Sequence, residues 1–509
     1  MNKSSIINTF LKIVEKGGNA LPHPATLFGI FALIILALSA LFGNLGMSAV
    51  HPITGETFEA INLLTRDGLY DILTKMVKNF TSFAPLGIVI VAMLGIGIAE
   101  NSGLIAVMIR GLVLTSPQKW LTFIIVIAGI VSNLASSVGY VLLVPLAGTI
   151  FLAIGRHPIA GMAAAFAGVS GGFSANLMLG TIDPLLAGLS EEAAHLVDKT
   201  YEVNPTANYY FMVVSTFVIA AIGTWVTEKI VVPSLGEYKS DGIKQDKIEK
   251  LSANEKKGLK WATLTFIGLM VLLLLGLIPA KGILRGLDGT ILESPVLKGV
   301  VAILFLFAGI LGIVYGVAVK KYKNDSDVMK GMAESMKSLA AYLVLVFFAA
   351  QFVEYFKWSN LGIILAINGA SFIKSLDLNL IPLIILFVIF SGSINLIMGS
   401  ASAKWALLAP IFVPMFMFLG YSPELTQVVY RIGDSVTNII SPMMSFFALI
   451  IVYFEKYDEK AGIGTLVATM LPYSILFFIG WVILLIIWLY AGLPLGPGAE
   501  IYYELALPK

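Results

Sequence analysis

The sequence predicts an all-α protein that crosses a membrane many times and contains an inverted-topology repeat. Of its 509 residues, 58% are hydrophobic and only 13% are charged, which is about half the charged share of an average soluble chain. Apolar runs of about 20 residues, each long enough to span a bilayer as a helix, recur along the chain without the alternation of barrel strands. Two stretches 265 residues apart also align without gaps.

Composition and missing motifs exclude several functions. The chain has no cysteine, which excludes disulfides and thiol redox chemistry. Its net charge of +2 gives no signal for a nucleic-acid partner, because the basic residues gather in loops. The sequence contains no Walker A motif, no HExxH and no GxSxG in a plausible context. We therefore expect neither an enzyme nor an ATP-driven pump, and no cofactor.

Lysines predict the orientation of the chain. The first apolar run, residues 27–45, is expected to be a retained helix, since no small-residue cleavage site follows it. Four clusters of lysines separate the apolar runs: Lys3, Lys12 and Lys16; seven lysines of the polar loop 234–260; Lys320, Lys321, Lys323, Lys330 and Lys337; and Lys456 with Lys460. The positive-inside rule places all four clusters, and the N-terminus, in the cytoplasm. Segments 261–279 and 297–319 then form one hairpin.

Two blocks of the chain each hold five apolar runs, and five crossings do not fit the charge pattern. The first block comprises 84–99, 104–115, 119–137, 139–154 and 158–182, and it must begin and end outside the cell. The second comprises 338–356, 359–374, 380–398, 403–419 and 425–452, and it must begin and end inside. Each block therefore needs a re-entrant or broken element. Because the two blocks start on opposite sides of the membrane, they predict an inverted repeat.

The repeat is also visible in the residues. "SSVGYVLLVPLAGTIFLAIGRHP" (136–158) aligns with "ASAKWALLAPIFVPMFMFLGYSP" (401–423), with seven identities in 23 positions. Chance similarity of apolar stretches explains part of this, but the matched Pro-x9-Gly-x2-Pro spacing is harder to obtain by accident. Internal inverted repeats are a common plan of secondary transporters.

Stretches rich in Ser, Gly and Asn flank the aligned segment in both blocks. They are 132–137 and 168–176 in the first block, and 391–402 and 433–442 in the second. These residues favour turns over helix, and broken backbone persists in a membrane only where it lines a site or is buried in protein. We interpret them as two half-sites for a small cation or an anion, with close helix packing as the alternative. The candidate ion-binding residues, with Na⁺ as the only metal considered, are Asn133, Ser137, Ser174, Asn176, Ser400, Ser402, Thr437 and Asn438.

Three ionisable residues are expected to lie deepest in these stretches, namely Asp183, Arg431 and Asp434. A charge at the bilayer centre costs about 2.5–3.5 kcal/mol even on the mildest scale. The functional interpretation is a carboxylate that carries a proton or a coupling ion, and a guanidinium that binds an anionic substrate. The alternative is a structural ion pair between Arg431 and Asp434, which lie three residues apart and share one helix face. Trp405 is either an interfacial belt residue or a stacking surface for an aromatic ligand.

These features favour a secondary transporter over two rivals. A channel would use the same polar pore without a coupling carboxylate. An intramembrane enzyme is disfavoured, since no nucleophile–base constellation accompanies Asp183 and Asp434.

Several long motifs, in the same order, resemble the p-aminobenzoyl-glutamate transporter (AbgT) family of the ion transporter superfamily. They are "SNLASSVGYVLLVPLAG", "GGFSANLMLGTIDPLLAG", "SGSINLIMGSASAKWALLAPIFVPM" and "YRIGDSVTNIISPMM". The resemblance implies about nine transmembrane helices with two re-entrant hairpins, in a bowl-shaped homodimer of a bacterial inner membrane. It implies transport of p-aminobenzoyl-glutamate and related aromatic anions, with proton-driven efflux of sulfonamide antimetabolites in some members. The coupling ion is either H⁺ or Na⁺, and sodium-coupled uptake of aminobenzoyl-glutamate or a dicarboxylate is the alternative function.

The resemblance also implies a transport site. The family's site positions fall on residues of the same type in this chain, which are Asp183, Asn395, Trp405, Pro423, Arg431 and Asp434. It implies that Arg431 binds a carboxylate or sulfonamide group and that Trp405 stacks on the aminobenzoyl ring. The two aspartates would carry the coupling charge.

The expected organisation has five parts. Residues 1–66 hold the N-terminal segment, the first transmembrane helix and an external loop, and 67–207 form the first repeat. Scaffold helices with the cytoplasmic loop occupy 208–337 and are the candidate dimer contact. The second repeat covers 338–452, and 453–509 hold the last transmembrane helix and a tail.

Overall fold

The structure is a computed structural model that describes residues 22–50, 55–134, 138–238 and 250–504. Within these residues the chain is almost wholly helical, and its only strands are β1 (Ser48–Val50) and β2 (Thr57–Glu59), which pair antiparallel. Eight described helices are long and apolar enough to cross a membrane, or nine if one bent pair counts as a span. The predicted all-α, polytopic membrane class is thereby confirmed.

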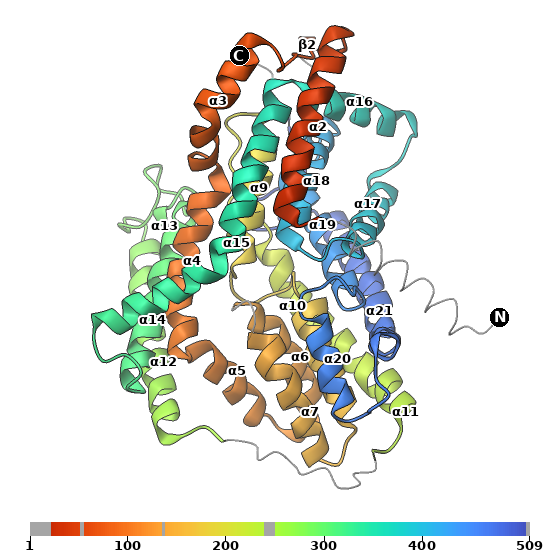
Figure 1. Ribbon diagram of the computed structural model, residues 1–509. Helices are drawn as coiled ribbons and strands as arrows, with labels where there is room; N and C mark the ends of the chain where they lie inside the picture. The colour runs from red at the N-terminus through yellow and green to blue at the C-terminus, as the bar shows by residue number, and fades with distance from the viewer. Residues whose placement is uncertain (1–21, 51–54, 135–137, 239–249, 505–509) are drawn as a thin grey trace, which may run out of the picture.

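The first block consists of short helices interrupted by breaks. Its elements are α3 (Arg66–Thr81), α4 (Ala84–Ser102), α5 (Leu104–Leu114), η1 (Gln118–Trp120), α6 (Leu121–Val131), η2 (Ser132–Leu134), η3 (Gly139–Leu143), α7 (Val144–Ala153), α8 (Pro158–Phe166), η4 (Ala167–Gly171) and α9 (Ile182–Ala194). The chain bends by 112° between α5 and the stretch from η1 to η2, which is the bent pair. Helices α6, α7 and α8 pack together near the lower end of the molecule (Figure 1). The predicted re-entrant or broken element of this block is therefore present.

The second block repeats this order of elements. It comprises α15 (Asp325–Trp358), α16 (Leu361–Ser375), α17 (Leu380–Asn395), α18 (Ala401–Phe418), α19 (Pro423–Asn438) and α20 (Phe447–Glu455). The predicted run 425–452 is not one helix, because residues 439–446 separate α19 from α20. Helix α17 packs on α19 as α6 packs on α8 and η4, while α16 and α18 form a further contact of this block.

Close approaches of a glycine to the backbone of a neighbouring helix occur at equivalent positions of the two blocks. A Cβ atom added to Gly168 would lie 2.3 Å from the carbonyl oxygen of Val126, and one added to Gly433 would lie 2.4 Å from that of Val388. Gly168 and Gly433 are separated by the same 265 residues as the aligned stretches. This similarity fits the predicted repeat, and its inverted relation stays a prediction.

The remaining helices surround these two blocks. They are α2 (Pro24–Asn44), α10 (Tyr209–Val226), η5 (Thr227–Val231), α11 (Val232–Leu235), α12 (Ala253–Leu277), α13 (Pro295–Lys298), α14 (Val300–Ala318) and α21 (Ile463–Tyr490). Helices α12 and α14 contact each other, which confirms the predicted hairpin, and α14 also packs along α4. Helix α3 continues the line of α4 and contacts α15 (Figure 1), with the Asn79 side chain donating to the Gln351 side chain at 2.9 Å.

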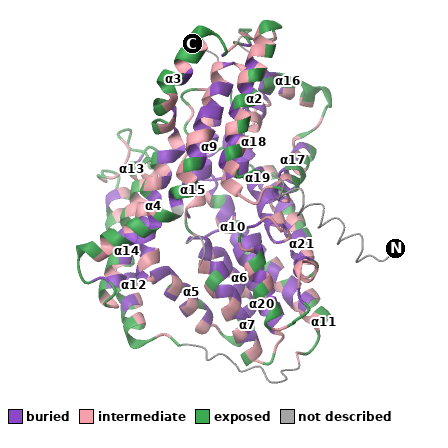
Figure 2. Cartoon of the chain, viewed as in Figure 1, coloured by how far each residue is buried: buried purple, intermediate pink, exposed green. Residues whose placement is uncertain are grey.

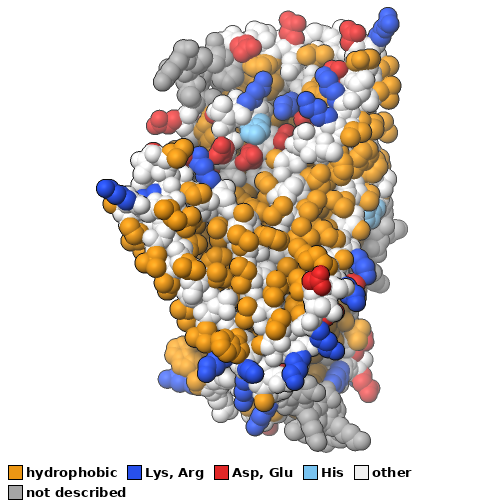
Figure 3. All heavy atoms as spheres, turned by 90° about the vertical axis from the view of Figure 1, so that its left-hand side faces the viewer, with side chains coloured by type: hydrophobic (Ala, Val, Ile, Leu, Met, Phe, Trp, Pro, Cys, Tyr) orange, Lys and Arg blue, Asp and Glu red, His pale blue; other side chains and the backbone are white. Residues whose placement is uncertain are grey.

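Burial separates an inner core from an outer surface that suits lipid. In the most apolar stretch of α18, 72% of the residues are buried, against 11% in α12 (Figure 2). On one face of the molecule, apolar side chains form a broad band between two ends that carry most of the charged side chains (Figure 3). Such a band is what a bilayer covers.

Candidate functional site

The site is built around two interruptions of helix in the second block. Helix α17 ends at Asn395, and α18 begins at Ala401 with the Ser400 hydroxyl accepting a hydrogen bond from the Ala403 amide at 3.4 Å. Helix α19 ends at Asn438, in the middle of the polar stretch 433–442. The prediction of a helix break at this stretch is therefore confirmed.

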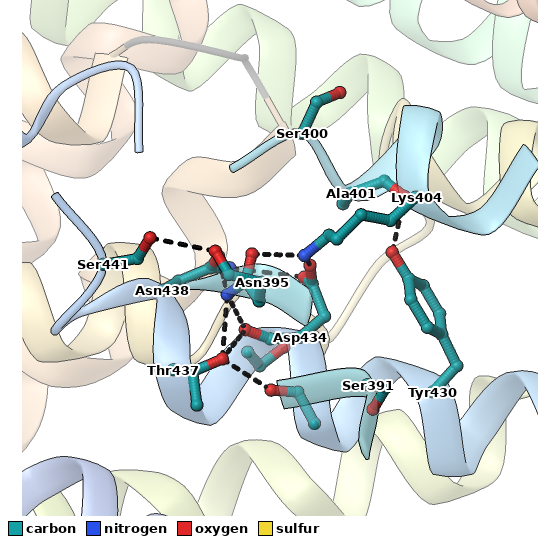
Figure 4. A network of polar contacts seen from close by, with 12 residues as sticks. Ser391, Asn395, Ser400, Ala401, Lys404, Tyr430, Asp434, Thr437, Asn438 and Ser441 are labelled. Carbon is teal, nitrogen blue, oxygen red and sulfur yellow. Dashed lines mark hydrogen bonds and ion pairs between the residues drawn. The ribbon is translucent and has the colours of Figure 1, made fainter. Parts of the chain in front are cut away.

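A buried ion pair joins the two interruptions. The Lys404 ammonium of α18 contacts the Asp434 carboxylate of α19, and these residues are 0% and 1% exposed (Figure 4). The same ammonium also contacts the side-chain oxygen of Asn395. Burying a single charge is costly unless it is paired and hydrogen-bonded, so the two charged side chains stabilise each other's burial.

Asn395 holds the end of α17 against α19. Its amide nitrogen lies 2.8 Å from the backbone oxygen of Asp434, 2.9 Å from the hydroxyl of Thr437 and 2.8 Å from the side-chain oxygen of Asn438 (Figure 4). The Ser441 hydroxyl donates to the backbone oxygen of Asn395 at 2.9 Å. These contacts fix the end of α17 against the last turns of α19, and the Asp434 carboxylate itself meets the Lys404 ammonium and the Asn438 amide.

A second buried ion pair lies one turn earlier on α19. The Arg431 guanidinium contacts the Asp183 carboxylate of α9 at 2.7 Å, and these residues are 3% and 1% exposed. The other oxygen of Asp183 accepts a hydrogen bond from the Gly180 amide at 2.7 Å. The Nε atom of Arg431 is buried without a hydrogen-bond partner among the described residues. The ion pair with Asp183 therefore does not use every donor of the Arg431 guanidinium.

The observed ion pairs differ from the alternative of a structural pair between Arg431 and Asp434. Arg431 and Asp434 do not pair with each other; each meets a partner from another helix, Asp183 of α9 and Lys404 of α18. Helix α19 is thus held on two sides by opposite charges from elements of both blocks. This arrangement ties the position of a discontinuous helix to the charge state of four side chains.

Trp405 is fully buried, which excludes the interfacial alternative for this residue. Its indole ring stacks on the Tyr430 ring with 4.5 Å between centroids, and its N–H donates to the Ser190 hydroxyl at 3.0 Å. The Tyr430 hydroxyl donates to the backbone oxygen of Ala401 at 2.5 Å. The aromatic face that the resemblance assigns to a ligand is covered by Tyr430 in this conformation.

The other candidates are divided between the network and its surroundings. Thr437 and Asn438 belong to the network around Asp434, while the hydroxyls of Ser400 and Ser402 lie 3.4 Å apart at the start of α18. Pro423 begins α19, about 16 Å along the helix axis from Asp434. Ser137 lies outside the described residues.

The first-block candidates bind mainly to backbone. The side-chain amides of Asn133 and Asn176 donate to the backbone oxygen of Ile130 at 3.2 and 3.4 Å. The Ser174 amide donates to the Ser435 hydroxyl at 3.1 Å, which connects the first block to α19. Of the four described candidates of this block, counting Asp183, only Asp183 and Ser174 contact α19 directly through a side chain or amide.

Sequence reasoning missed two buried ionisable residues, Lys404 and Glu424. Lys404 lies in an apolar run, where the rule that flagged Asp183 and Arg431 also applies. Its position next to the expected loop at 400–402 made an exposed location equally compatible with the pattern. Glu424 lies beside a proline at a helix start, a place where acidic residues are common on surfaces.

The acceptors of the network around Asp434 are oxygen atoms. No group of three His, Cys, Asp or Glu side chains suited to a metal occurs in the described part of the chain. The side-chain oxygens of Asp434 and Asn395 accept from the Lys404 ammonium, whereas those of Thr437 and Asn438 accept from the side-chain amide of Asn395. In this conformation the Lys404 ammonium supplies the positive charge there.

Discontinuous helices that carry buried, paired charges at their interruptions are typical of membrane transporters. The comparisons with known proteins give the family. Residues 9–503 match the model of the AbgT putative transporter family, and the chain belongs to this family. It is 36% identical to the p-aminobenzoyl-glutamate transport protein of Escherichia coli (strain K12) over 486 residues, which cover 95% of both chains.

Two solved transporter structures are similar over almost the whole chain. The Alcanivorax borkumensis YdaH transporter is 47% identical with a TM-score of 0.89, covering 94% of this chain and 100% of that one. Neisseria gonorrhoeae MtrF, described among a class of antimetabolite efflux pumps, is 51% identical with a TM-score of 0.91, covering 96% and 100%. The predicted family is thus confirmed, and the chain is a transporter and not an enzyme.

Proposed function

We propose that this protein is a proton-driven secondary transporter of p-aminobenzoyl-glutamate and related aromatic anions, and that it exports sulfonamide antimetabolites. The observation that carries the proposal is the pair of buried ion pairs on one discontinuous helix, α19. The names of two relatives support the substrate class, one as a p-aminobenzoyl-glutamate transport protein and one as an antimetabolite efflux pump.

The substrate fits the groups that surround α19. An aromatic amide with two carboxylates needs a cation and an aromatic face, which Arg431 and Trp405 provide. Both groups have internal partners here, Asp183 and Tyr430. Substrate binding therefore requires that a ligand carboxylate share or replace Asp183 and that a ligand ring displace Tyr430. This exchange of partners would release α19 from α9 and α18, which is how binding would lead to a change of access.

Coupling is assigned to the Lys404–Asp434 pair. Removing one proton from this pair leaves a single buried negative charge, and the side-chain oxygen of Asn395 beside it then lacks its cation. Such a site is expected to favour either reprotonation or the entry of Na⁺. We assign the proton as the coupling ion because an ammonium already contacts the oxygens that Na⁺ would use; sodium-coupled uptake is the second candidate.

The site would work within a symmetric assembly. We propose a homodimer in the bacterial inner membrane, with the N-terminus in the cytoplasm as the lysine clusters indicate. The scaffold part, residues 208–337, is the proposed dimer contact, since its helix α12 is the least buried of the candidate spans. Alternating access would then move the two repeats, including α19, relative to this scaffold.

A reconstitution experiment tests the proposal. Labelled p-aminobenzoyl-glutamate is followed in proteoliposomes while proton and sodium gradients are imposed separately, with Asp434→Asn measured in parallel. We expect a proton gradient alone to drive flux, and Asp434→Asn to abolish this coupling while exchange of labelled for unlabelled ligand persists. Flux driven by a sodium gradient alone would overturn the proton assignment, and the absence of counterflow would indicate a channel.

A further inference from the structure

A buried carboxylate without a cationic partner lies at the start of α19. Glu424 is 4% exposed, and within the described residues it forms no ion pair. Its Oε2 atom accepts a hydrogen bond from the Tyr201 hydroxyl at 2.8 Å. A buried carboxylate that lacks a cation is costly in its charged form, so a proton on it is favoured by burial.

Two segments are hydrogen-bonded to the start of α19 beside Glu424, namely the connection from α9 to α10 and the segment after α21. The Asn208 side chain donates to the backbone oxygen of Glu424 at 3.1 Å. The preceding residue, Ser422, donates its amide to the backbone oxygen of Ile501 at 3.0 Å. The backbone at the start of α19 is therefore held on both sides, and the Glu424 carboxylate itself is held by the Tyr201 hydroxyl.

An outward connection leads from Glu424 to exposed groups. The Tyr201 ring meets the Tyr503 ring edge-on, with 5.5 Å between centroids, and the Tyr503 hydroxyl donates to the Asp198 carboxylate at 3.3 Å. Asp198 also accepts hydrogen bonds from the amide and hydroxyl of Thr200 in an exposed turn. The two tyrosine hydroxyls thus lie between a buried carboxylate and one near solvent.

An inward connection leads from α19 to the proposed substrate site. The Gln427 side chain, one turn after Glu424, donates to the Asn208 side chain at 2.8 Å and accepts from the Ser190 hydroxyl at 2.7 Å. Ser190 in turn accepts from the indole N–H of Trp405 at 3.0 Å. Asn208 contacts both Gln427 and the backbone of Glu424, so this chain reaches from Trp405 to the start of α19.

Glu424 does not take part in either buried ion pair of α19, and its charged neighbours have other partners. On its own helix, Arg431 is two turns away and already paired with Asp183. The last part of α9 and its end carry Glu191, whose carboxylate accepts from the Val203 amide, and His195, whose ring contacts the backbone oxygen of Tyr201. None of these forms an ion pair with Glu424 among the described residues.

We propose that Glu424 is a second proton-binding residue of the transport cycle and that it exchanges its proton with the end of the molecule opposite the lysine clusters. This inference rests on the proposed transport function. Helix α21 starts beside Lys456 and Lys460 and crosses the membrane, so the segment that follows it, with Tyr503, lies at that opposite end. Glu424 is about 15 Å along α19 from the Lys404–Asp434 pair, which places one proton-binding group at each end of this helix.

The proton balance is simple. When a proton arrives at the Glu424 carboxylate, the group becomes neutral, and its hydroxyl can donate to Tyr201, which then acts as acceptor. When the proton leaves, Tyr201 donates to the carboxylate again and the negative charge returns. Because Pro423 and Glu424 form the first turn of α19, this change of charge acts on the end of the helix that carries Arg431 and Asp434.

The experiment compares Glu424→Gln with Glu500→Gln, an exposed residue of the segment after α21 that loses the same charge. Purified full-length protein is titrated in an infrared difference experiment that detects the carboxylic acid C=O stretch. We expect a titrating band in the wild type and in Glu500→Gln, and its loss in Glu424→Gln. Tyr201→Phe keeps the carboxylate but removes its hydrogen bond, so the pH at which the band titrates should rise.

Transport gives a second measurement. We expect exchange of labelled p-aminobenzoyl-glutamate to depend on the pH at the Glu424 end in the wild type, and Glu424→Gln to lose this dependence while exchange continues. An unchanged infrared titration in a folded Glu424→Gln protein would overturn the proposal, as would an unchanged titration in Tyr201→Phe if Glu424→Gln fails to fold. Absence of exchange in the wild type would contradict the proposed function alone, since the infrared result does not depend on a substrate.

Discussion

The two half-sites share a backbone frame but differ in charge. In the second block Lys404 contacts Asp434, whereas the residues 265 positions earlier are Gly139 and Val169. The latter two also face each other, since a Cβ atom on Gly139 would lie 2.8 Å from both methyl groups of Val169. An ion pair in one block thus corresponds to a close apolar contact in the other.

A similar contact between an asparagine and a backbone oxygen lies beside each of these two residue pairs. Asn133, near the end of α6, donates to the backbone oxygen of Val169 at 3.0 Å, and Asn395, at the end of α17, donates to that of Asp434 at 2.8 Å. An asparagine therefore ties a helix end to its neighbour in both blocks. The asparagine contact is therefore part of the fold, whereas the buried charges are present in one half only. Charges in a membrane interior are by default functional.

Removal of the Lys404 ammonium should give the largest difference in stability between equivalent substitutions in the two half-sites. Lys404→Met leaves the Asp434 carboxylate buried and unpaired, so we expect a loss of about 3–5 kcal/mol in stability, measured by thermal or denaturant unfolding in detergent. Gly139→Ala, at the equivalent position, is expected to cost less because it creates no buried charge.

The double variant Lys404→Met with Asp434→Leu provides the control for this prediction. Replacing both partners of a buried pair by apolar residues is often neutral, so stability should return while gradient-driven transport stays lost. A Lys404→Met protein as stable as the wild type would show that the pair is not what holds α19 against α18.

The close helix approaches should respond alike in the two halves. Gly433→Ala and Gly168→Ala each place a methyl group within 2.4 Å of a backbone oxygen, so one helix must move. We expect each to cost about 3 kcal/mol, the upper part of the range for overpacking, in the same unfolding experiment. A large cost at Gly433 with none at Gly168 would show that the two helix approaches are not equivalent.

The smallest effect on stability is expected from replacing the two asparagines, and these variants separate the contact that both halves share from the charge that only one half carries. Asn395→Ala and Asn133→Ala each leave buried groups without a partner, at a cost of about 2 kcal/mol. Because only Asn395 also contacts Lys404, only Asn395→Ala should change the dependence of transport on the proton gradient. Equal changes in transport for both variants would contradict the idea that Asn133 has only a structural role while Asn395 also acts on the charged pair.

Much of this organisation was predictable from the residues in order. The lysine clusters and the five apolar runs predicted broken elements in both blocks, and the polar stretch 433–442 correctly marked the end of α19. These predicted features follow from hydropathy, turn propensity and spacing, which are local properties of a chain. The matched approaches of Gly168 and Gly433, which lie outside the aligned stretches, were not predicted.

The pairing of charges was decided by the tertiary structure alone. From sequence, Arg431 and Asp434 share a helix face and could pair, yet Arg431 meets Asp183, which is 248 residues away, and Asp434 meets Lys404. Likewise, the sequence allowed Trp405 to be an interfacial residue or a stacking surface for an aromatic ligand, and only the fold showed that it is buried with Tyr430 stacked on it. A linear pattern shows that a charge needs a partner, because an unpaired buried charge is costly. Which partner it meets depends on the rotation and crossing of helices that lie far apart in the chain, and no local property of the sequence determines that.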